Sequence, residues 1–135
     1  MSQPDFRAKL VLKAVVSPSE DTTKVKEALH RIIGEAPSDP RGNAGMLGLV
    51  TEDSRAFARL RDQLRDRHVR SAARKQLLVN SLGASTSLML NRQAAAAGVI
   101  AICSSPEESP LGPVYVTIES DNVEKVIDWL TAYSG

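Results

Sequence analysis

The sequence predicts an α+β fold, a two-layer sandwich in which helices pack on one face of a mixed or largely antiparallel sheet of about five strands. Two observations lead to this class. Apolar residues alternate with a period of two in some segments and recur at helical spacing in others. The last three predicted strands are joined by short connections, which antiparallel neighbours allow and parallel ones do not. The 135 residues suit a single domain, 1–135, with a core from about 6 to 133.

The first third of the chain predicts two strands separated by a helix. Residues 7–16 alternate apolar and polar side chains, as a half-buried strand does. A capping box at 17–20 then opens a helix whose apolar stripe stops at Gly34. The next segment, 36–45, has the composition of a loop, and the apolar run at 46–50 predicts a short buried strand.

A long helical stretch, from about 53 to 82, contains a change of phase. The apolar stripe that ends at Leu64 resumes at Val69, a step that does not fit one continuous helical face. We therefore predict a break near Arg67–His68 and two helices rather than one rod.

The last third predicts strands at 87–90, 99–103 and 114–119. Residues 109–112, Ser-Pro-Leu-Gly, have the chemistry of a type I turn. A capping box that begins at Asp121 opens the final helix. The predicted order is therefore β-α-β-α-α-β-β-β-α.

The composition excludes several classes of protein. The chain is 42% hydrophobic and 24% charged, which is ordinary for a globular domain. No apolar run approaches the roughly 20 residues of a membrane span, and the amino terminus lacks the apolar centre of a signal peptide. The single cysteine, Cys103, cannot form an internal disulfide. We therefore expect a cytoplasmic protein with no membrane partner.

The formal net charge of +1 conceals a basic block. Residues 55–75 contain seven arginines and one lysine against two aspartates, whereas the remainder of the chain holds nine basic and fourteen acidic residues. A local block of this kind indicates an anionic partner more specifically than the overall charge does.

Spacing places several of these basic side chains on common helix faces. At 100° per residue, Arg67, Arg70 and Arg74 fall within about 60° of one another, a row that suits a phosphate backbone. Arg55 and Arg59 share a face with two aspartates, Asp62 and Asp66, so local pairing is their alternative. For any single arginine, a solvated helix surface is the alternative. The candidate RNA contacts are Arg61, Arg65, Arg67, Arg70, Arg74, Lys75 and, from outside the block, Arg92.

The stretch LNRQAAAAG, residues 90–98, separates two predicted strands. Asn91 can end the first strand by bonding to local backbone, and the alanines permit a turn of helix or a close crossing of two backbones. Gly98 permits an unusual dihedral before the next strand. The functional alternative places Arg92 and Gln93 on phosphate, sugar or an exposed base edge. We favour an architectural role for the alanines and leave Arg92 open.

Motifs for catalysis, metal binding and nucleotide phosphates have little support. The adjacent Glu107 and Glu108 have the chemistry for acid–base catalysis, but neighbouring acids in a loop are usually just solvated. His30 and His68 have no partners at ligand spacing, and Cys103 ends an apolar strand, as a core residue does. No glycine-rich phosphate loop occurs. We therefore expect no cofactor, no metal and no enzymatic activity.

Three sequence features carry a family resemblance: the motif at 90–95, Leu-Asn-Arg-Gln-Ala-Ala, the motif at 108–113, Glu-Ser-Pro-Leu-Gly-Pro, and the terminal Val-Ile-Asp-Trp-Leu. With these motifs the chain resembles an archaeal uncharacterised protein family that was later labelled RNA-binding. The resemblance runs from about Phe6 to Leu130. It implies a fold similar to that of the large-subunit ribosomal protein that binds 5S ribosomal RNA, and RNA as the partner. It implies no catalytic residues.

Three hypotheses of function follow. The leading one is a non-catalytic RNA-binding protein whose arginine-rich helices contact the phosphate backbone of structured RNA. The second is a structural or protein-interaction module, which forms a homo-oligomer or binds an acidic protein partner. The third is a small enzyme or binding protein for a phosphorylated metabolite.

Overall fold

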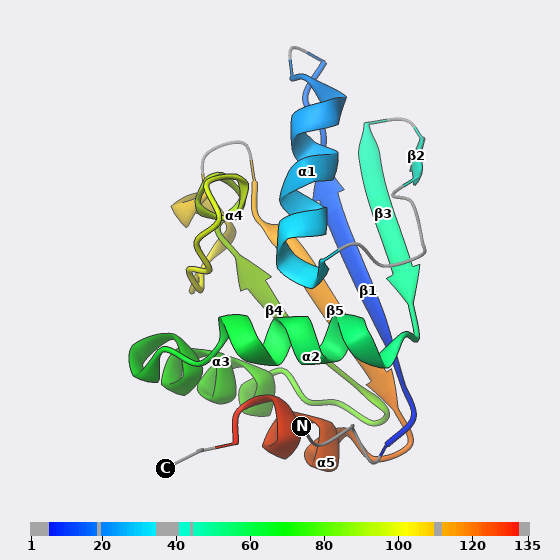
Figure 1. Ribbon diagram of the computed structural model, residues 1–135, viewed down its shortest axis with the longest axis vertical. Coiled ribbons are helices and arrows are strands. Elements are labelled where there is room, and N and C mark those ends of the chain that lie inside the picture. The colour runs from blue at the N-terminus through cyan, green and yellow to red at the C-terminus, as the bar shows by residue number, and fades with distance from the viewer. Residues whose placement is uncertain (1–5, 19, 35–40, 44, 110–111, 133–135) are drawn as a thin grey trace.

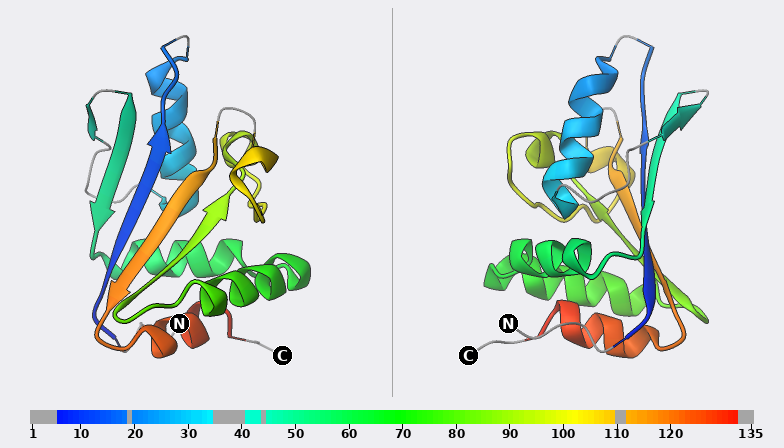
Figure 2. Two further views of the ribbon diagram at one scale, coloured as in Figure 1. Left: turned by 180° about the vertical axis from the view of Figure 1, so that it is seen from behind. Right: turned by 45° about the vertical axis from the view of Figure 1, so that its right-hand side comes forward.

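The computed structural model has the predicted class, an antiparallel five-stranded sheet with helices on one of its faces (Figure 1, Figure 2). It describes residues 6–18, 20–34, 41–43, 45–109 and 112–132. The right-hand view of Figure 2 separates the two layers and places the helices on the same side of the sheet. Each strand pair in the described part of the chain is antiparallel. The predicted two-layer α+β class is therefore confirmed.

The first strand of the chain lies in the middle of the sheet, whose order is β2-β3-β1-β5-β4. The strands are β1 (Ala8–Val15), β2 (Arg41–Asn43), β3 (Met46–Thr51), β4 (Ser85–Leu90) and β5 (Val114–Ser120). Because β1 pairs with β3 on one side and with β5 on the other, its inward side chains occupy the centre of the core.

Alternation along the strands decides which face of the sheet is covered. Leu10, Leu12 and Ala14 of β1 are fully buried. Leu12 lies between Leu49 of β3 and Val116 of β5, both of which are also buried. Each such leucine or valine contributes roughly 1.5–3 kcal/mol by leaving water. The intervening side chains point to the uncovered face.

The helices in the described residues cover the inward face. They are α1 (Thr22–Ile33), α2 (Ser54–Gln63), α3 (Arg67–Val79), α4 (Arg92–Ala96) and α5 (Val123–Leu130), with a 3-10 turn at Pro106–Glu108. Helix α1 packs on α2 and α4, whereas α2 and α3 both contact α5. Each longer helix turns an apolar stripe toward the sheet; in α1 the stripe includes Val25, Leu29 and Ile32.

The predicted break in the long helical stretch is confirmed and lies between α2 and α3. Leu64 caps the end of α2, and α3 begins at Arg67. Asp66 is the N-cap of α3. Its carboxylate accepts hydrogen bonds from the backbone N–H groups of His68 at 2.9 Å and Val69 at 3.3 Å. The apolar phase predicted the break, and an aspartate cap is its physical cause.

Two helices begin slightly later than predicted. The Ser17–Glu20 contact forms, with the Glu20 carboxylate accepting the Ser17 N–H at 2.8 Å, but it closes a turn that precedes α1. The N-cap of α1 is Asp21. Likewise, the N-cap of α5 is Asn122 rather than Asp121.

One strand lies where the sequence predicts a loop. β2 falls within 36–45, of which 36–40 and 44 are outside the described residues. Its three residues, Arg-Gly-Asn, carry no apolar alternation and pair with β3 at the edge of the sheet. So short an edge strand leaves no periodic signal in the sequence.

The strand predicted at 99–103 is wrong. Its only pairing in the described structure is an isolated bridge between Ile102 and Leu90. The segment is apolar because Ile100 and Cys103 are buried, not because a ladder forms. The turn predicted at 109–112 has the expected hydrogen bond, from the Gly112 N–H to the Ser109 carbonyl at 2.9 Å; residues 110 and 111 lie outside the described residues.

Side chains of α3 and of its C-cap residue, Asn80, bind the outer edge of β4. The Gln76 amide accepts the Met89 N–H at 2.6 Å and donates to the Cys103 carbonyl at 2.7 Å. Asn80 donates to the Ser87 carbonyl at 2.9 Å. These bonds occupy backbone groups that an edge strand would otherwise offer to another chain. Helix α3 is therefore fixed to the sheet by polar contacts as well as by its apolar stripe.

We expect Gln76→Ala to lower the free energy of unfolding by about 2 kcal/mol, because the Met89 N–H and the Cys103 carbonyl lose their partner. Gln93→Ala is the matched control, since Gln93 is an exposed glutamine of α4. It should change the free energy by less than about 0.5 kcal/mol. Urea unfolding followed by circular dichroism measures both, and equal effects would contradict this role of Gln76.

Candidate functional site

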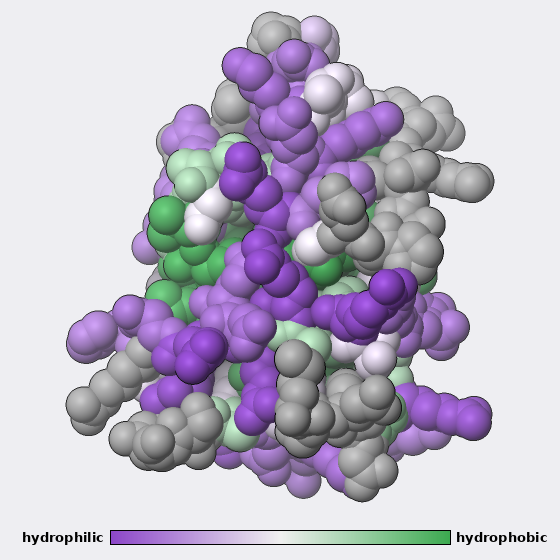
Figure 3. Space-filling view, in the orientation of Figure 1, coloured by the Kyte–Doolittle hydropathy of each residue, from purple (hydrophilic) through white to green (hydrophobic). Residues whose placement is uncertain are grey.

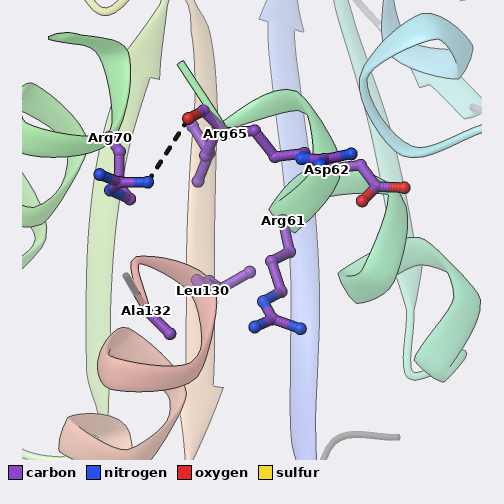
Figure 4. Close-up of a pocket in the computed structure, with 7 residues that line it drawn as sticks. Arg61, Asp62, Arg65, Arg70, Leu130 and Ala132 are labelled. Atoms are coloured by element: carbon purple, nitrogen blue, oxygen red, sulfur yellow. Dashed lines mark hydrogen bonds between the residues drawn. The ribbon is translucent and has the colours of Figure 1, made fainter. Parts of the chain in front are cut away.

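The basic block lines a pocket where α2 ends, α3 begins and α5 finishes. The pocket has a volume of about 170 Å³ and is lined by Arg61, Asp62, Leu64, Arg65, Arg70, Leu130 and Ala132. In Figure 4, Arg65 and Arg70 lie above the last turn of α5, and Arg61 points down beside it. Three of the lining side chains are cationic and one is a carboxylate, so the lining carries a net positive charge.

Local sequence explains why these arginines share one surface. Leu64 is fully buried, which directs its neighbour Arg65 to the outside of the chain reversal. Because Asp66 starts a new helix at once, Arg70 returns to the same place one turn later. The Arg70 guanidinium donates a hydrogen bond to the Arg65 backbone carbonyl at 3.4 Å, as the dashed line in Figure 4 marks.

An aromatic cluster positions Arg61. Its guanidinium carbon lies 4.9 Å from the centre of the Trp129 ring. Trp129 packs edge-on against Phe6, with ring centres 5.5 Å apart, and Phe6 does the same with Phe57 at 5.6 Å. A cation–π contact of this kind orients the guanidinium without neutralising its charge. The buried indole N–H of Trp129 has no acceptor among the described residues.

Arg74 is held by α5. Its guanidinium donates to the Asp128 carboxylate at 3.0 Å and to the Thr131 hydroxyl at 3.1 Å. The Arg74 side chain keeps 43% of its surface exposed. The pair joins α3 to α5, and Asp128 offsets part of the positive charge of the predicted row. Lys75 is exposed on the outer side of α3, and the side chain of Arg67 is outside what the structure describes.

Arg55 forms an ion pair with Asp53 at 2.7 Å rather than with Asp62 or Asp66. Asp53 also caps α2 by accepting the Arg55 N–H at 2.8 Å. Hydrogen bonds from the Arg55 side chain and then from its backbone lower the pKa of the Asp53 carboxyl. Arg55 therefore pairs locally, which was the alternative to an RNA contact, but its partner is Asp53, the N-cap of α2.

Arg92 is not a surface contact, so its place among the predicted RNA contacts is wrong. The side chain is only 4% exposed and pairs with the Glu20 carboxylate at 2.9 Å. It also donates to the backbone carbonyl of Val15, at the end of β1. A guanidinium that is buried and bonded in this way has a structural role, because moving it to solvent would leave Glu20 and Val15 without this partner.

The motif around Arg92 is architectural, as the alanines suggested. Asn91 caps α4 by accepting the Ala94 N–H at 3.0 Å, and Ala95 is buried where α4 meets α1. The Arg92 N–H donates to the Ser109 hydroxyl at 3.2 Å, and that hydroxyl donates to the Gly112 carbonyl at 2.8 Å. The two most specific motifs of the sequence therefore bind each other.

The side chains weighed for metal binding and for catalysis have other surroundings in the described structure. No group of three His, Cys, Asp or Glu side chains there could hold a metal ion. Cys103 is buried, and burial, helped by the nearby Glu108, raises the pKa of its thiol. Glu108 is used locally, since it accepts the backbone N–H groups of Ser104 and Ser105. No described helix is long and apolar enough to cross a membrane.

The structure therefore brings together three of the predicted contacts, Arg61, Arg65 and Arg70, in one pocket. Arg74 lies next to them in an ion pair, and Lys75 lies further round α3. The contact between the Arg61 guanidinium and the Trp129 ring was not predicted from the sequence. The only sequence signal for it is that Trp129 is the single tryptophan of a chain poor in aromatic residues.

No family model matches the chain, but individual relatives do. The UPF0201 protein of Sulfurisphaera tokodaii is 35% identical over 125 residues, which cover 91% of this chain and 86% of the relative. The UPF0201 protein of Sulfolobus acidocaldarius is 34% identical over the same length and coverage.

Solved structures give the same picture. The crystal structure of a UPF0201 protein from Methanococcus jannaschii superposes with a TM-score of 0.77 at 26% identity, covering 91% of this chain and 98% of that one. The structure of a DUF54 protein from Methanothermobacter thermautotrophicus superposes with a TM-score of 0.65 at 18% identity, covering 93% and 96%. At that identity the likeness shows the fold alone.

We expect Arg92→Met to lower the free energy of unfolding by about 3–5 kcal/mol, because the Glu20 carboxylate, only 14% exposed, loses its partner. Adding Glu20→Gln should recover part of this loss, since no unpaired buried charge remains. Urea unfolding of the wild type, the two single variants and the double variant forms a double-mutant cycle. Strictly additive effects would show that the two side chains are not coupled.

Proposed function

The chain belongs to the UPF0201 family of archaeal proteins, and we propose that it binds RNA without catalysing a reaction. The phosphate backbone would lie across the junction of α2 and α3. The observation that carries this proposal is the pocket at that junction, which Arg61 of α2, Arg65 of the connection and Arg70 of α3 line together. Guanidinium groups bind phosphate oxygens through charge-assisted and often paired hydrogen bonds.

The arrangement of the arginines favours an extended anion over a small one. In Figure 4 the guanidinium groups of Arg61, Arg65 and Arg70 point in different directions around the pocket. A single phosphometabolite is held best by groups that converge on one point. A nucleic acid instead offers a phosphate at every nucleotide, so arginines that diverge can each contact a different one.

The position of α3 favours RNA over duplex DNA. A helix that reads DNA projects into the major groove, which is about 12 Å wide. Helix α3 instead has one side packed against β4 and α5. The sequence resemblance to a family labelled RNA-binding supports the same choice. Figure 3 shows hydrophilic side chains crowding the face over α2, which suits a polar partner.

A protein-interaction module is the second candidate, and the uncovered face of the sheet favours it. Val15, Met46, Val50 and Tyr115 are between 37% and 51% exposed there. Val15 and Met46 are direct cross-strand partners, so two of these side chains adjoin. Light scattering separates the two functions, because this module requires self-association or a protein partner whereas RNA binding requires neither.

We expect the double variant Arg65→Gln, Arg70→Gln to weaken RNA binding and to reduce the slope of log K against log salt by about 1.4–1.8, the value for two lost phosphate contacts. The control is Arg31→Gln, Arg59→Gln, which removes the same charge from exposed arginines that do not line the pocket. Filter binding to total RNA over a range of salt measures the slopes. Equal slopes in the two double variants would contradict the proposed surface.

We expect Asp128→Asn to strengthen RNA binding about threefold, because it removes the carboxylate that competes with phosphate for Arg74. Glu124→Gln is the matched control, since it removes an equal charge from an exposed residue of the same helix. The same filter assay at fixed salt compares the two. If both variants bind equally, Arg74 does not contact the RNA.

A further inference from the structure

A second hollow lies on the other flank of α3, where that helix meets the edge of β4 and the segment that follows α4. Its volume of about 500 Å³ is within the usual range for small-ligand sites. Its aliphatic walls come from Val79, Met89 and Ile102, and its polar groups include Lys75, Gln76 and Asn80. The backbone-binding surface proposed above does not use it.

Two polar side chains of this hollow, Gln76 and Asn80, are fixed before any ligand arrives. Gln76 is bonded through both ends of its amide to Met89 and Cys103, at 2.6 and 2.7 Å. The Asn80 amide nitrogen donates to the Ser87 carbonyl at 2.9 Å. Within the described residues the Asn80 amide oxygen accepts no hydrogen bond, so it presents an oriented acceptor. A preorganised site of this kind loses little entropy when a ligand binds.

Helical spacing places the two hollows on opposite flanks of α3. At 100° per residue, Val79 lies opposite Arg70 on the helix, and Gln76 lies about 120° from Arg70. Lys75 is exposed and falls between these flanks, on the outer surface. The helix is only about 10 Å across with its side chains. A flexible strand held by the arginines therefore reaches the second hollow by crossing a single helix.

We propose that this hollow accepts an unpaired nucleobase of the RNA whose backbone lies across the α2–α3 junction. The inference rests on the proposed function and deepens it, because it adds a contact with a base to a surface that otherwise binds only the phosphate backbone. Unpaired bases are the usual targets of specific RNA recognition, and enzymes hold a flipped base between apolar side chains with hydrogen bonds to its edge. Val79, Met89 and Ile102 supply the apolar faces here, and Asn80 supplies an acceptor for a base amino group.

The surroundings of the hollow favour this occupant. Lys75 at its rim suits the phosphate next to the bound base. Val79 is 75% exposed, an apolar side chain that a stacked base would cover. A peptide that added a strand to β4 is disfavoured, because Gln76, Asn80 and Cys103 already occupy the outward backbone groups of Met89 and Ser87.

The test uses two fluorescein-labelled RNA hairpins, one with a single unpaired nucleotide in its stem and one with the same stem fully paired. The wild type should bind the first about tenfold more tightly, a difference of about 1.4 kcal/mol, because only that hairpin offers an unpaired base to the hollow. Ala72→Trp fills the hollow from an exposed position of α3 and should abolish the preference. Ala96→Trp makes the same change at an exposed alanine of α4 outside the hollow, and should retain it.

Binding of the fully paired hairpin separates this inference from the proposed function, and it also shows that each variant is folded. If the wild type binds both hairpins equally, RNA binding stands and the base pocket is overturned. A preference that survives Ala72→Trp overturns it as well. If neither hairpin binds at low salt, the proposed function fails and the inference fails with it. If Ala72→Trp abolishes self-association in light scattering without changing the hairpin preference, the hollow belongs to a second copy of the chain.

Discussion

The ion pair between Arg92 and Glu20 lies at one end of the fold, where four segments that are far apart in the sequence meet. Arg92 begins α4, Glu20 precedes α1, and the same guanidinium donates to Val15 at the end of β1. The Arg92 N–H also binds Ser109, which begins the turn before β5. A charge with 4% exposure is tolerated only when it is paired and hydrogen-bonded. These contacts therefore form together, and they occupy the Arg92 guanidinium, so it is not available to a ligand.

The arginines of the proposed RNA-binding surface lie elsewhere, on α2, α3 and the connection between them, below α4 in Figure 1. Helix α3 serves two purposes there. Gln76 and Asn80 close the β4 edge, and Leu77 packs into the core, whereas Arg70 and Lys75 face outward from other sides of the same helix. Because Gln76, Asn80 and Leu77 carry none of this charge, Arg70 and Lys75 can be replaced without removing the contacts that those three side chains make.

Periodicity predicted the fold class because each long element buries one face, and burial of one face leaves a period in the sequence. Periodicity gives a wrong prediction where a segment is buried without pairing along a neighbouring strand. Residues 99–103 are such a segment, because they are apolar but form no ladder. Periodicity also gives no information about contacts between distant residues. Arg74 and Asp128 are 54 positions apart, and Arg92 and Glu20 are 72 apart. Spacing placed each arginine on a helix face, but only the fold decides which of them meets a carboxylate.

A surface that binds a polyanion must keep cations unneutralised, and their mutual repulsion opposes folding. The placement of the nearby acids reduces this conflict. Asp53 and Asp66 act as N-caps, where a carboxylate satisfies free backbone N–H groups and interacts favourably with the helix dipole. They stabilise α2 and α3 from the helix starts, while Arg61 is oriented by the uncharged ring of Trp129. Helix stability and exposed positive charge are thus supplied by different residues, which lets one short helical hairpin provide both.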